Sequence, residues 1–320
     1  MVELIHVLRK AAPDAHITML VDEKLNDVVL FNPYLDEVVT IDKKGRDNSI
    51  LSLWACSRHL SKLDFDVLIN LHPNERCSFI DAMTSVKLRT GTTHKIFKWF
   101  RDVFTPLDRS MHAADMYLDV LQQLGVQDLS NNGLEIFPGE EHFLEAELFW
   151  QEQNITDQDK LIGFNIGSAV PTKRWPPERF AEVADIFAAK GYKTVFFGGP
   201  MDEELVAEAT GYMQTRPIIA TGHLAIGGLA AALRRCCLII TNDSGPMHVA
   251  ISQKVPIVAM YGPSNPKLYG PYTKDAVIVT AQPPCQGCAD GMKHSCDDLQ
   301  CMSRMTVEQV VAAAEQLLEK

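Results

Sequence analysis

The amino-acid sequence predicts an α/β protein built from two doubly wound domains with parallel sheets. Short apolar runs rich in β-branched residues alternate with amphipathic helical stretches in both halves of the 320-residue chain. This alternation is typical of parallel sheets that are covered on both faces by helices. Charged sequence interrupts the pattern around residues 140–160, and we interpret it as one helix followed by a polar linker. We therefore expect a first domain over residues 1–155 and a second over residues 156–320.

The expected strands of the first half are short, rich in β-branched residues and followed by turn residues. They are HITMLVD, EVVTI, DVLINL and KLRTG. Apolar residues at helical spacing predict helices between them, such as ILSLWACSRHLSKL and HAADMYLDVLQQLG, the second ending on Gly125. The chain itself opens inside a helix, MVELIHVLRKAAPDA, whereas a doubly wound domain normally opens on a strand and a loop. We therefore expect the first strand of this domain to be missing.

The second half repeats the alternation of strands and helices. Its expected strands are LIGFNIGS, KTVFFGG, PIIAT, CLIITN and PIVAMYG. Its expected helices are PERFAEVADIFAAK, DEELVAEATGYM, LAIGGLAAALRRC, GPMHVAISQK and, at the end, TVEQVVAAAEQLLEK. Ligands of doubly wound domains bind outside the carboxyl ends of the strands. The loops after LIGFNI, TVFFGG, PIIAT and CLIIT should therefore line one rim of the second domain.

Composition and charge exclude several classes of protein. The apolar fraction is 46% and the charged fraction is 22%, which are ordinary values for a globular protein. A net charge of −11 argues against a broad nucleic-acid surface, because such a surface needs a basic stripe. The sequence has neither an apolar run of the roughly 18–20 residues that span a bilayer nor an export signal. We expect a cytoplasmic protein with reduced thiols, in which any anionic ligand is held by a local site.

The segment NDSGPMH, directly after the strand CLIIT, is the first candidate site. Pro246 suits the first turn of a helix, and Ser244 and Gly245 place small residues at the positive end of that helix. Helix N-termini bind phosphate, and His248, about one turn into the helix, can donate toward the same anion. Asp243 would repel a phosphate, so we expect it to accept hydrogen bonds from sugar hydroxyls. Helix capping by Asp243 or Ser244 is the structural alternative, but it explains only one of these residues.

The loop GSAVPTKRWPPERF, after the strand LIGFNI, is the second candidate site. Lys173 can neutralise a diphosphate as a point charge, and Ser168 and Thr172 offer hydroxyl groups. A solvated surface position is the alternative for Lys173 and for its neighbour Arg174. Leu224, ahead of the helix AIGGLAAAL, is either a core residue or a contact to a nucleotide base.

Two further groups of residues lie outside these loops. Arg76, in NLHPNERCS after the strand DVLI, is a candidate for gripping an anionic acceptor, with a simple solvated loop as the alternative. One polar segment carries a C-x2-C-x7-C-x4-C pattern, made by Cys285, Cys288, Cys296 and Cys301. Four such ligands could hold a structural zinc ion, while free thiols or a disulfide are the alternatives.

With these residues in place, the sequence resembles glycosyltransferase family 9, the ADP-heptose:lipopolysaccharide heptosyltransferases. The resemblance rests on LIITNDSGPMHVAISQKVPIVAMYGPSNP, IGFNIGSAVPTKRWPPERF and KTVFFGGPMDEEL, and it runs along nearly the whole chain. It implies a GT-B fold with two Rossmann-like domains facing a cleft. Residues 1–155 would bind the acceptor, and residues 156–320 would bind the nucleotide sugar and send their last helix back toward the first domain.

The resemblance also implies an inverting transfer of heptose from ADP-heptose to the lipopolysaccharide inner core, without a metal cofactor. The transfer would take place at the inner face of the cytoplasmic membrane, with peripheral membrane contact. The donor would be held by residues that match family positions; they are Ser168, Lys173, Leu224, Asp243, Ser244, Gly245 and His248. A base in the first domain would deprotonate the acceptor hydroxyl. Lys173 and the helix N-terminus would stabilise the charge of the departing diphosphate.

Two departures from the family pattern bear on these expectations. The family's proposed base is an aspartate in a Gly-Asp loop ahead of the first helix. We expect that loop to lie upstream of Met1, so we assign no catalytic residue. Met201 stands where many members have an acidic residue after GGP, on which recognition of the ribose would depend. The alternatives are a GT-B enzyme with another nucleotide-sugar donor or acceptor, and a nucleotide-sugar-binding module without turnover.

Overall fold

The chain divides into two compact units, Met1–Asn132 and Gly133–Lys320. The computed structural model describes residues 2–106, 108, 110–281, 296 and 298–320. Helix α5 (Glu140–Glu152) packs against α8 (Ile226–Leu233), so it belongs to the second unit. The division therefore lies ahead of α5, whereas the sequence pattern placed it after this helix, near residue 155.

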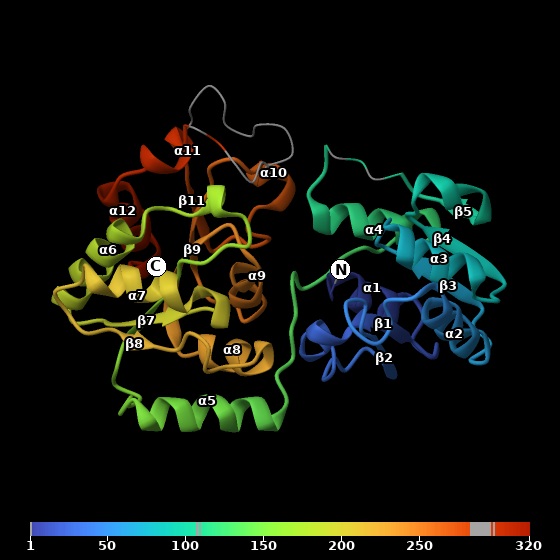
Figure 1. Ribbon diagram of the computed structural model, residues 1–320, viewed down its shortest axis with the longest axis horizontal. Helices are drawn as coiled ribbons and strands as arrows, with labels where there is room; N and C mark the ends of the chain where they lie inside the picture. Colours follow the sequence, from blue (N-terminus) through green and yellow to red (C-terminus); the bar gives the residue numbers. More distant parts are fainter. Residues whose placement is uncertain (1, 107, 109, 282–295, 297) are drawn as a thin grey trace. The chain divides into compact units, whose positions relative to one another are not determined.

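The second unit is built on one six-stranded parallel sheet (Figure 1). Its strands are β6 (Leu161–Asn165), β7 (Lys193–Phe197), β8 (Ile218–Ile219), β9 (Cys236–Asn242), β10 (Ile257–Met260) and β11 (Ala276–Val279). They lie in the order β8-β7-β6-β9-β10-β11, which is the order of a dinucleotide-binding Rossmann sheet. From β6 the chain adds β7 and β8 on one side of the sheet, and from β9 it adds β10 and β11 on the other side. The topological switch point therefore lies between β6 and β9.

Two groups of helices cover this sheet. One group is α6 (Pro177–Ala189), α7 (Glu203–Gly211) and α12 (Val307–Leu318), and the other is α8 and α9 (Gly245–Ser252). Right-handed crossovers on the two sides of the switch point place the helices of β6–β8 and of β8–β10 on opposite faces, as Figure 1 shows. Helix α12 contacts α6 and the strands β9, β10 and β11. Whether this last helix also returns toward the first domain stays a prediction.

Aromatic side chains fill the core between the sheet and α6. Phe164, Phe180, Phe187 and Phe196 are fully buried in one cluster, and the rings of Phe164 and Phe196 stack with centroids 5.2 Å apart. The remaining elements of this unit are short connections: η3 (Pro171–Lys173), η4 (Pro200–Asp202), α10 (Pro266–Tyr269) and α11 (Gln300–Ser303). A rigid core under short connections holds the loops at the strand ends in fixed positions.

The first unit contains two parallel sheets. Its strands are β1 (Thr18–Asp22), β2 (Glu37–Ile41), β3 (Val67–Asn70), β4 (Leu88–Gly91) and β5 (Val103–Phe104), paired as β1-β2 and as β3-β4-β5. Its helices are α1 (Val2–Ala11), η1 (Glu23–Val28), α2 (Ile50–Ser61), α3 (Glu75–Met83), η2 (Lys95–Phe100) and α4 (Ala113–Gln123). Helix α1 packs on α4 through Leu4, Val7, Leu118 and Leu121.

The predicted α/β class with parallel sheets is confirmed. Every strand expected from the sequence is present, as β1–β4 and β6–β10. Strands β5 and β11, which were not expected, lie at sheet edges, where a strand needs only one hydrogen-bonding neighbour and leaves a short apolar signal. Among the described residues, no helix is both long and apolar enough to cross a membrane.

Candidate functional site

The ends of β6 and β9 bring the two predicted donor loops together. The strands are neighbours in register, with Asn165 opposite Thr241. The buried side-chain amide of Asn165 donates to Thr241 Oγ1 at 3.1 Å and to Ser244 Oγ at 2.7 Å. One residue at the end of β6 therefore holds the loop that follows β9. This is the switch point, where doubly wound sheets bind their ligands.

The start of α9 lacks a side-chain cap. Ser244 is the N-cap residue with extended backbone angles, but its side chain makes no capping hydrogen bond. Asp243 lies one residue earlier, and its carboxylate accepts hydrogen bonds from the side chains of Lys173 and Ser264. Capping therefore does not account for Asp243 or Ser244. The positive end of α9 begins at the exposed Gly245, followed by Pro246 in the first turn.

Asp243 is the centre of a polar network that joins three strand ends. Its Oδ2 lies 2.7 Å from Lys173 Nζ and accepts a hydrogen bond from Ser264 Oγ at 2.5 Å. The Lys173 and Asp243 side chains are 18% and 8% exposed, so the pair is mostly withdrawn from water. Such a pair is favourable only when hydrogen bonds compensate the lost hydration, and Ser264 supplies one. The network fixes Lys173 over the loop after β9.

Tyr261 closes the same network from the end of β10. Its hydroxyl donates to Tyr269 O at 2.7 Å and lies 3.4 Å from Asp243 Oδ1. Burial, together with the negative charge of Asp243, raises the pKa of Tyr261 above its ordinary value. Tyr261 therefore stays neutral and orders the loop beside the carboxylate without adding charge.

Side-chain hydrogen bonds to main-chain carbonyls hold the loop after β6. Ser168 is buried, and its hydroxyl donates to Asp243 O at 3.3 Å. The Arg174 guanidinium donates to Ser168 O at 2.9 and 2.7 Å. Trp175 is fully buried, and its indole N–H donates to Met305 O at 3.1 Å. The hydrogen bonds of Arg174 and Trp175 thus stabilise the conformation of this loop.

The other predicted donor residues lie around this network. Thr172 is buried in η3 beside Lys173. His248 is half-buried in the first turn of α9. Leu224 is half-buried in the loop ahead of α8. Whether these residues contact a ligand stays a prediction.

Sequence reasoning missed Ser264, Tyr261 and Asp202. Ser264 and Tyr261 follow β10, the strand next to β9, so their position at a carboxyl end was the available signal. Asp202 follows Met201, which is 84% exposed. The Asp202 carboxylate lies so close to Gly167 that a Cβ there would come within 2.2 Å of Oδ1. The first acidic residue after GGP is thus residue 202, whose Oδ2 accepts a hydrogen bond from Gly199 N at 3.0 Å and whose carboxylate lies against the loop after β6.

A hollow of about 600 Å³ lies at the other end of β9, where this strand begins. It is lined by residues of α5 and by Ala231, Arg234 and Arg235, which precede β9. Arg235 pairs there with Asp157 at 3.2 Å. Ligands of doubly wound sheets bind at the carboxyl ends of the strands, so the loops after β6 and β9, and not this hollow, remain the predicted donor site.

The first unit places Arg76 in an internal contact. Its guanidinium donates to Lys43 O and to Asn48 Oδ1, which ties α3 to the loop after β2. Asn74 is the N-cap residue of α3, and its Oδ1 accepts a hydrogen bond from Cys77 N at 2.8 Å. Binding of an anionic acceptor substrate by Arg76 stays a prediction. In the structure its side chain contacts Lys43 and Asn48 of its own unit.

The predicted zinc cluster lies partly outside the described residues. Cys285 and Cys288 fall in the segment 282–295, which the structure does not describe. Cys296 is exposed and Cys301 is buried. Among the described residues, no group of three or more His, Cys, Asp or Glu side chains is arranged to hold a metal ion.

Comparison with known proteins places the chain in a family. A sequence model described as Glycosyltransferase family 9 (heptosyltransferase) matches residues 53–296. The chain belongs to glycosyltransferase family 9. A solved structure of a family 9 glycosyl transferase from Veillonella parvula DSM 2008 is 51% identical. It covers 99% of this chain and 92% of that one, with a TM-score of 0.94.

Two heptosyltransferases show the same relationship at lower identity. Lipopolysaccharide heptosyltransferase 3 of Escherichia coli (strain K12) is 24% identical over 98% of this chain and 93% of its own. The structure of E. coli ADP-heptose LPS heptosyltransferase II is 20% identical and covers 99% of this chain and 93% of that one, with a TM-score of 0.77. These likenesses confirm the predicted GT-B fold class, and family 9 membership makes the chain a glycosyltransferase.

Proposed function

We propose that this family 9 enzyme transfers heptose from ADP-heptose to the inner core of lipopolysaccharide at the inner face of the cytoplasmic membrane. The observation that carries the proposal is the Lys173–Asp243 pair at the switch point of a Rossmann sheet. It lies beside an α9 start that no side chain caps. We infer that the second unit binds the donor and that the first unit binds the acceptor.

The donor site offers positive charge to a diphosphate from two directions. Backbone N–H groups at the start of a helix such as α9 can donate to an anion and carry the positive end of the helix dipole. Lys173 contributes a full charge, and its ammonium has three donors, of which Asp243 takes one. Because 18% of the Lys173 side chain is exposed, the ammonium can contact a ligand while it keeps its ion pair.

The carboxylates of the site would contact the sugar hydroxyls of the donor and not its phosphates. An anionic carboxylate disfavours direct contact with phosphate but accepts hydrogen bonds from hydroxyl groups. Asp243 therefore suits the heptose hydroxyls beside the diphosphate. Asp202, next to Gly167, suits a hydroxyl of the ribose at the other end of the loop after β6.

The reaction then needs charge stabilisation on the leaving group. The acceptor hydroxyl oxygen bonds to the anomeric carbon from the face opposite the diphosphate, and the bond from that carbon to the diphosphate oxygen breaks. ADP leaves with the electron pair, and the hydroxyl proton passes to a base. Lys173 and the α9 N-terminus are placed before the reaction, so they stabilise the developing negative charge without reorganisation. We propose that this step proceeds without a metal ion, with these two groups stabilising the charge of the departing ADP.

The proposal is tested by following product formation with two donors. The enzyme is incubated with a heptose-deficient core acceptor and either ADP-heptose or ADP-glucose, and the acceptor mass is measured. A mass increase of one heptose with ADP-heptose, and none with ADP-glucose, is expected. Transfer of glucose instead would show a different donor. Calorimetric binding of ADP-heptose without any transfer would indicate a binding module, and no ADP binding would contradict the donor site itself.

A further inference from the structure

One segment of the first unit exposes apolar side chains beside lysines. We call residues 95–104, from η2 through β5, the docking turn. Residues three apart lie on the same face of a 3-10 helix. Ile96 and Trp99 therefore share a face, and they are 67% and 94% exposed. Lys95 and Lys98 share the neighbouring face and are also exposed. An apolar row and a basic row thus run side by side.

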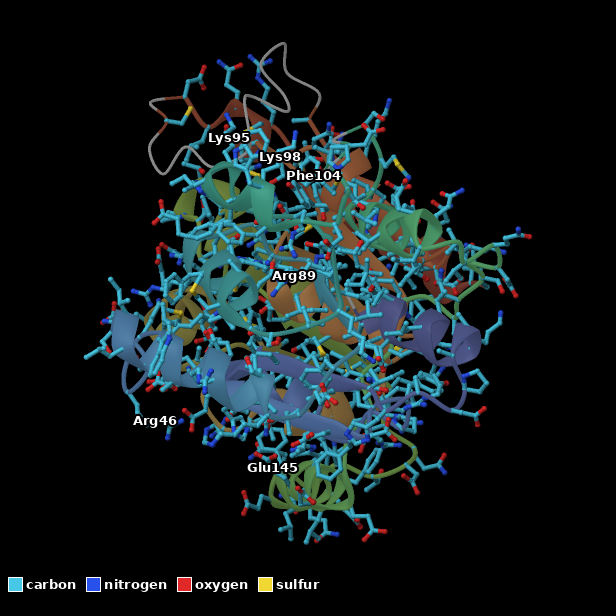
Figure 2. The ribbon with its side chains drawn as sticks, turned by 90° about the vertical axis from the view of Figure 1, so that its right-hand side faces the viewer. Arg46, Arg89, Lys95, Lys98, Phe104 and Glu145 are labelled. Carbon is cyan, nitrogen blue, oxygen red and sulfur yellow. The ribbon has the colours of Figure 1, made fainter. Side chains whose placement is uncertain are left out.

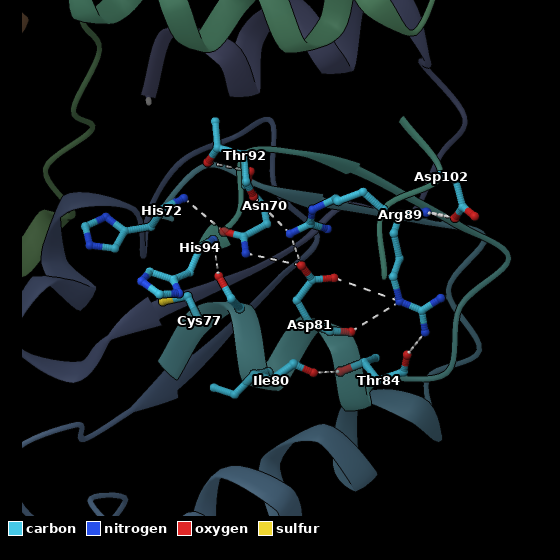
Figure 3. A network of polar contacts seen from close by, with 12 residues as sticks. Asn70, His72, Cys77, Ile80, Asp81, Thr84, Arg89, Thr92, His94 and Asp102 are labelled. Carbon is cyan, nitrogen blue, oxygen red and sulfur yellow. Dashed lines mark hydrogen bonds and ion pairs between the residues drawn. The ribbon is translucent and has the colours of Figure 1, made fainter. Parts of the chain in front are cut away.

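Contacts at both ends hold the docking turn against the interior of its unit, in the network shown in Figure 3. Just ahead of it, the His94 backbone N–H donates to Ser78 Oγ at 2.9 Å. Within it, Arg101 has a side chain that is 1% exposed; it pairs with Asp81 and donates to Thr92 O at 2.9 Å. Breaking a buried ion pair is strongly unfavourable, so these contacts fix the path of the chain. The apolar row is exposed on a segment that is held in place.

The charge of the docking turn is opposite to that of the whole chain. Its exposed charged side chains are Lys95 and Lys98 against one acidic residue, Asp102, in a protein of net charge −11, because Arg101 is buried in its pair with Asp81. Lys98 Nζ lies 4.7 Å from the centroid of the Phe104 ring, so its stem covers an aromatic face while its charge stays exposed. Figure 2 shows Lys95, Lys98 and Phe104 gathered together.

This combination fits a lipid headgroup layer. Tryptophan rings prefer the headgroup level of a bilayer, apolar side chains bury at the boundary of headgroups and acyl chains, and lysines near an anionic surface gain from its negative potential. A contact between two copies of the turn would instead bring lysine rows together, because a symmetric contact pairs the same surface patch with itself. Charge complementarity therefore favours an anionic membrane over a second copy.

We propose that the docking turn binds the surface of a bilayer containing anionic phospholipid. Ile96 and Trp99 insert among the headgroups, and Lys95 and Lys98 contact lipid phosphates. The chain would then attach to a membrane without a spanning helix. The inference depends on the exposed face of the first unit and is independent of the sugar that the donor site binds.

Tryptophan fluorescence tests insertion, because Trp99 can be compared with a second exposed tryptophan. The full-length protein is mixed with phosphatidylcholine–phosphatidylglycerol vesicles whose acyl chains are brominated, which quench only tryptophans that enter the bilayer. Quenching is expected in the wild type and in Trp54→Phe, and its loss is expected in Trp99→Phe. Trp54 is the matched control, since it lies on α2 and is 52% exposed. Quenching that survives in Trp99→Phe would overturn the proposal.

Vesicle sedimentation tests the role of the lysines. Binding to the mixed vesicles should exceed binding to phosphatidylcholine alone. The variant Lys95→Ser/Lys98→Ser should lower the affinity roughly 30-fold, because each lysine at an anionic surface contributes about fivefold. Its ADP affinity by calorimetry should be unchanged, so a failure of membrane binding leaves the donor site unaffected. Equal binding to both vesicle types overturns the proposal. So does a concentration-dependent dimer that Ile96→Ser/Trp99→Ser abolishes.

Discussion

We expect Lys173 to contribute both to ADP affinity and to the free energy of unfolding. The variant Lys173→Met allows the two contributions to be measured separately. Methionine keeps most of the apolar stem and removes the ammonium, so the loop after β6 keeps its packing. A charge-assisted hydrogen bond contributes about 1.5–3 kcal/mol, so ADP should bind roughly 10–150-fold more weakly. Isothermal titration calorimetry with ADP measures this effect.

The same variant should also lower the free energy of unfolding. It leaves the Asp243 carboxylate, which is 8% exposed, without the cation that lies 2.7 Å away. Breaking a fully buried pair costs about 3–5 kcal/mol, and Lys173 is 18% exposed, so we expect about 2 kcal/mol. Urea unfolding measures the loss. The added change Asp243→Asn should recover part of it, because the uncompensated charge is then removed.

Lys190→Met is the matched control for both measurements. Lys190 pairs with Glu315 in the same unit, but these side chains are 43% and 44% exposed. Exposed pairs contribute about 1 kcal/mol or less, so stability should change little and ADP affinity not at all. If Lys173→Met loses stability as expected while its ADP affinity stays within about twofold of the wild type, Lys173 has a structural role only. That result would refute its placement on the diphosphate.

Three further predictions follow from the residues that shape the site. Burial raises the pKa of Tyr261, so the native state should be fully stable below the ordinary tyrosine pKa of about 10 and lose stability as the pH rises above it. In Tyr261→Phe, the free energy of unfolding measured with urea should depend less on pH above pH ~10. The same pH dependence as in the wild type would contradict this. Trp175→Ala should cost about 3–5 kcal/mol of unfolding free energy because Trp175 is fully buried and donates to Met305 O; a loss below about 1 kcal/mol would show that the site collapses around the cavity. Gly167→Ala should weaken ADP binding, because its Cβ would lie 2.2 Å from Asp202 Oδ1 and displace that carboxylate. Calorimetry that gives wild-type affinity for this variant would remove Asp202 from the donor site.

The alternation of strands and helices made much of the fold predictable. Buried parallel strands appear in the sequence as short apolar runs, and the turn residues after LIGFNI and CLIIT marked the loops that the structure brings together. The switch point also follows from this pattern once the strand order is known. The order itself depends on contacts between distant segments, so the sequence could not show that β6 pairs with β9.

The polar network of the site was less accessible to sequence reasoning. Asp243 and Lys173 are 70 residues apart, and each was assigned to a ligand from its chemistry and from the position of its loop after a strand. Their mutual ion pair, and the hydrogen bond from Ser264, arise from tertiary structure. The sequence predicted a helix followed by a polar linker around residues 140–160, but it could not show that this helix, α5, packs on α8 and so belongs to the second unit. The docking turn likewise combines an apolar pattern, typical of a core, with exposure that only the structure reveals.

The position of bound ADP is the most direct test of the donor site. A crystal structure of the ADP complex should show the diphosphate within hydrogen-bond distance of the Gly245 backbone N–H and of Lys173 Nζ, at the carboxyl ends of β6 and β9. A diphosphate bound instead near Arg234 and Arg235, at the end of the sheet where β9 begins, would contradict this position of the donor site.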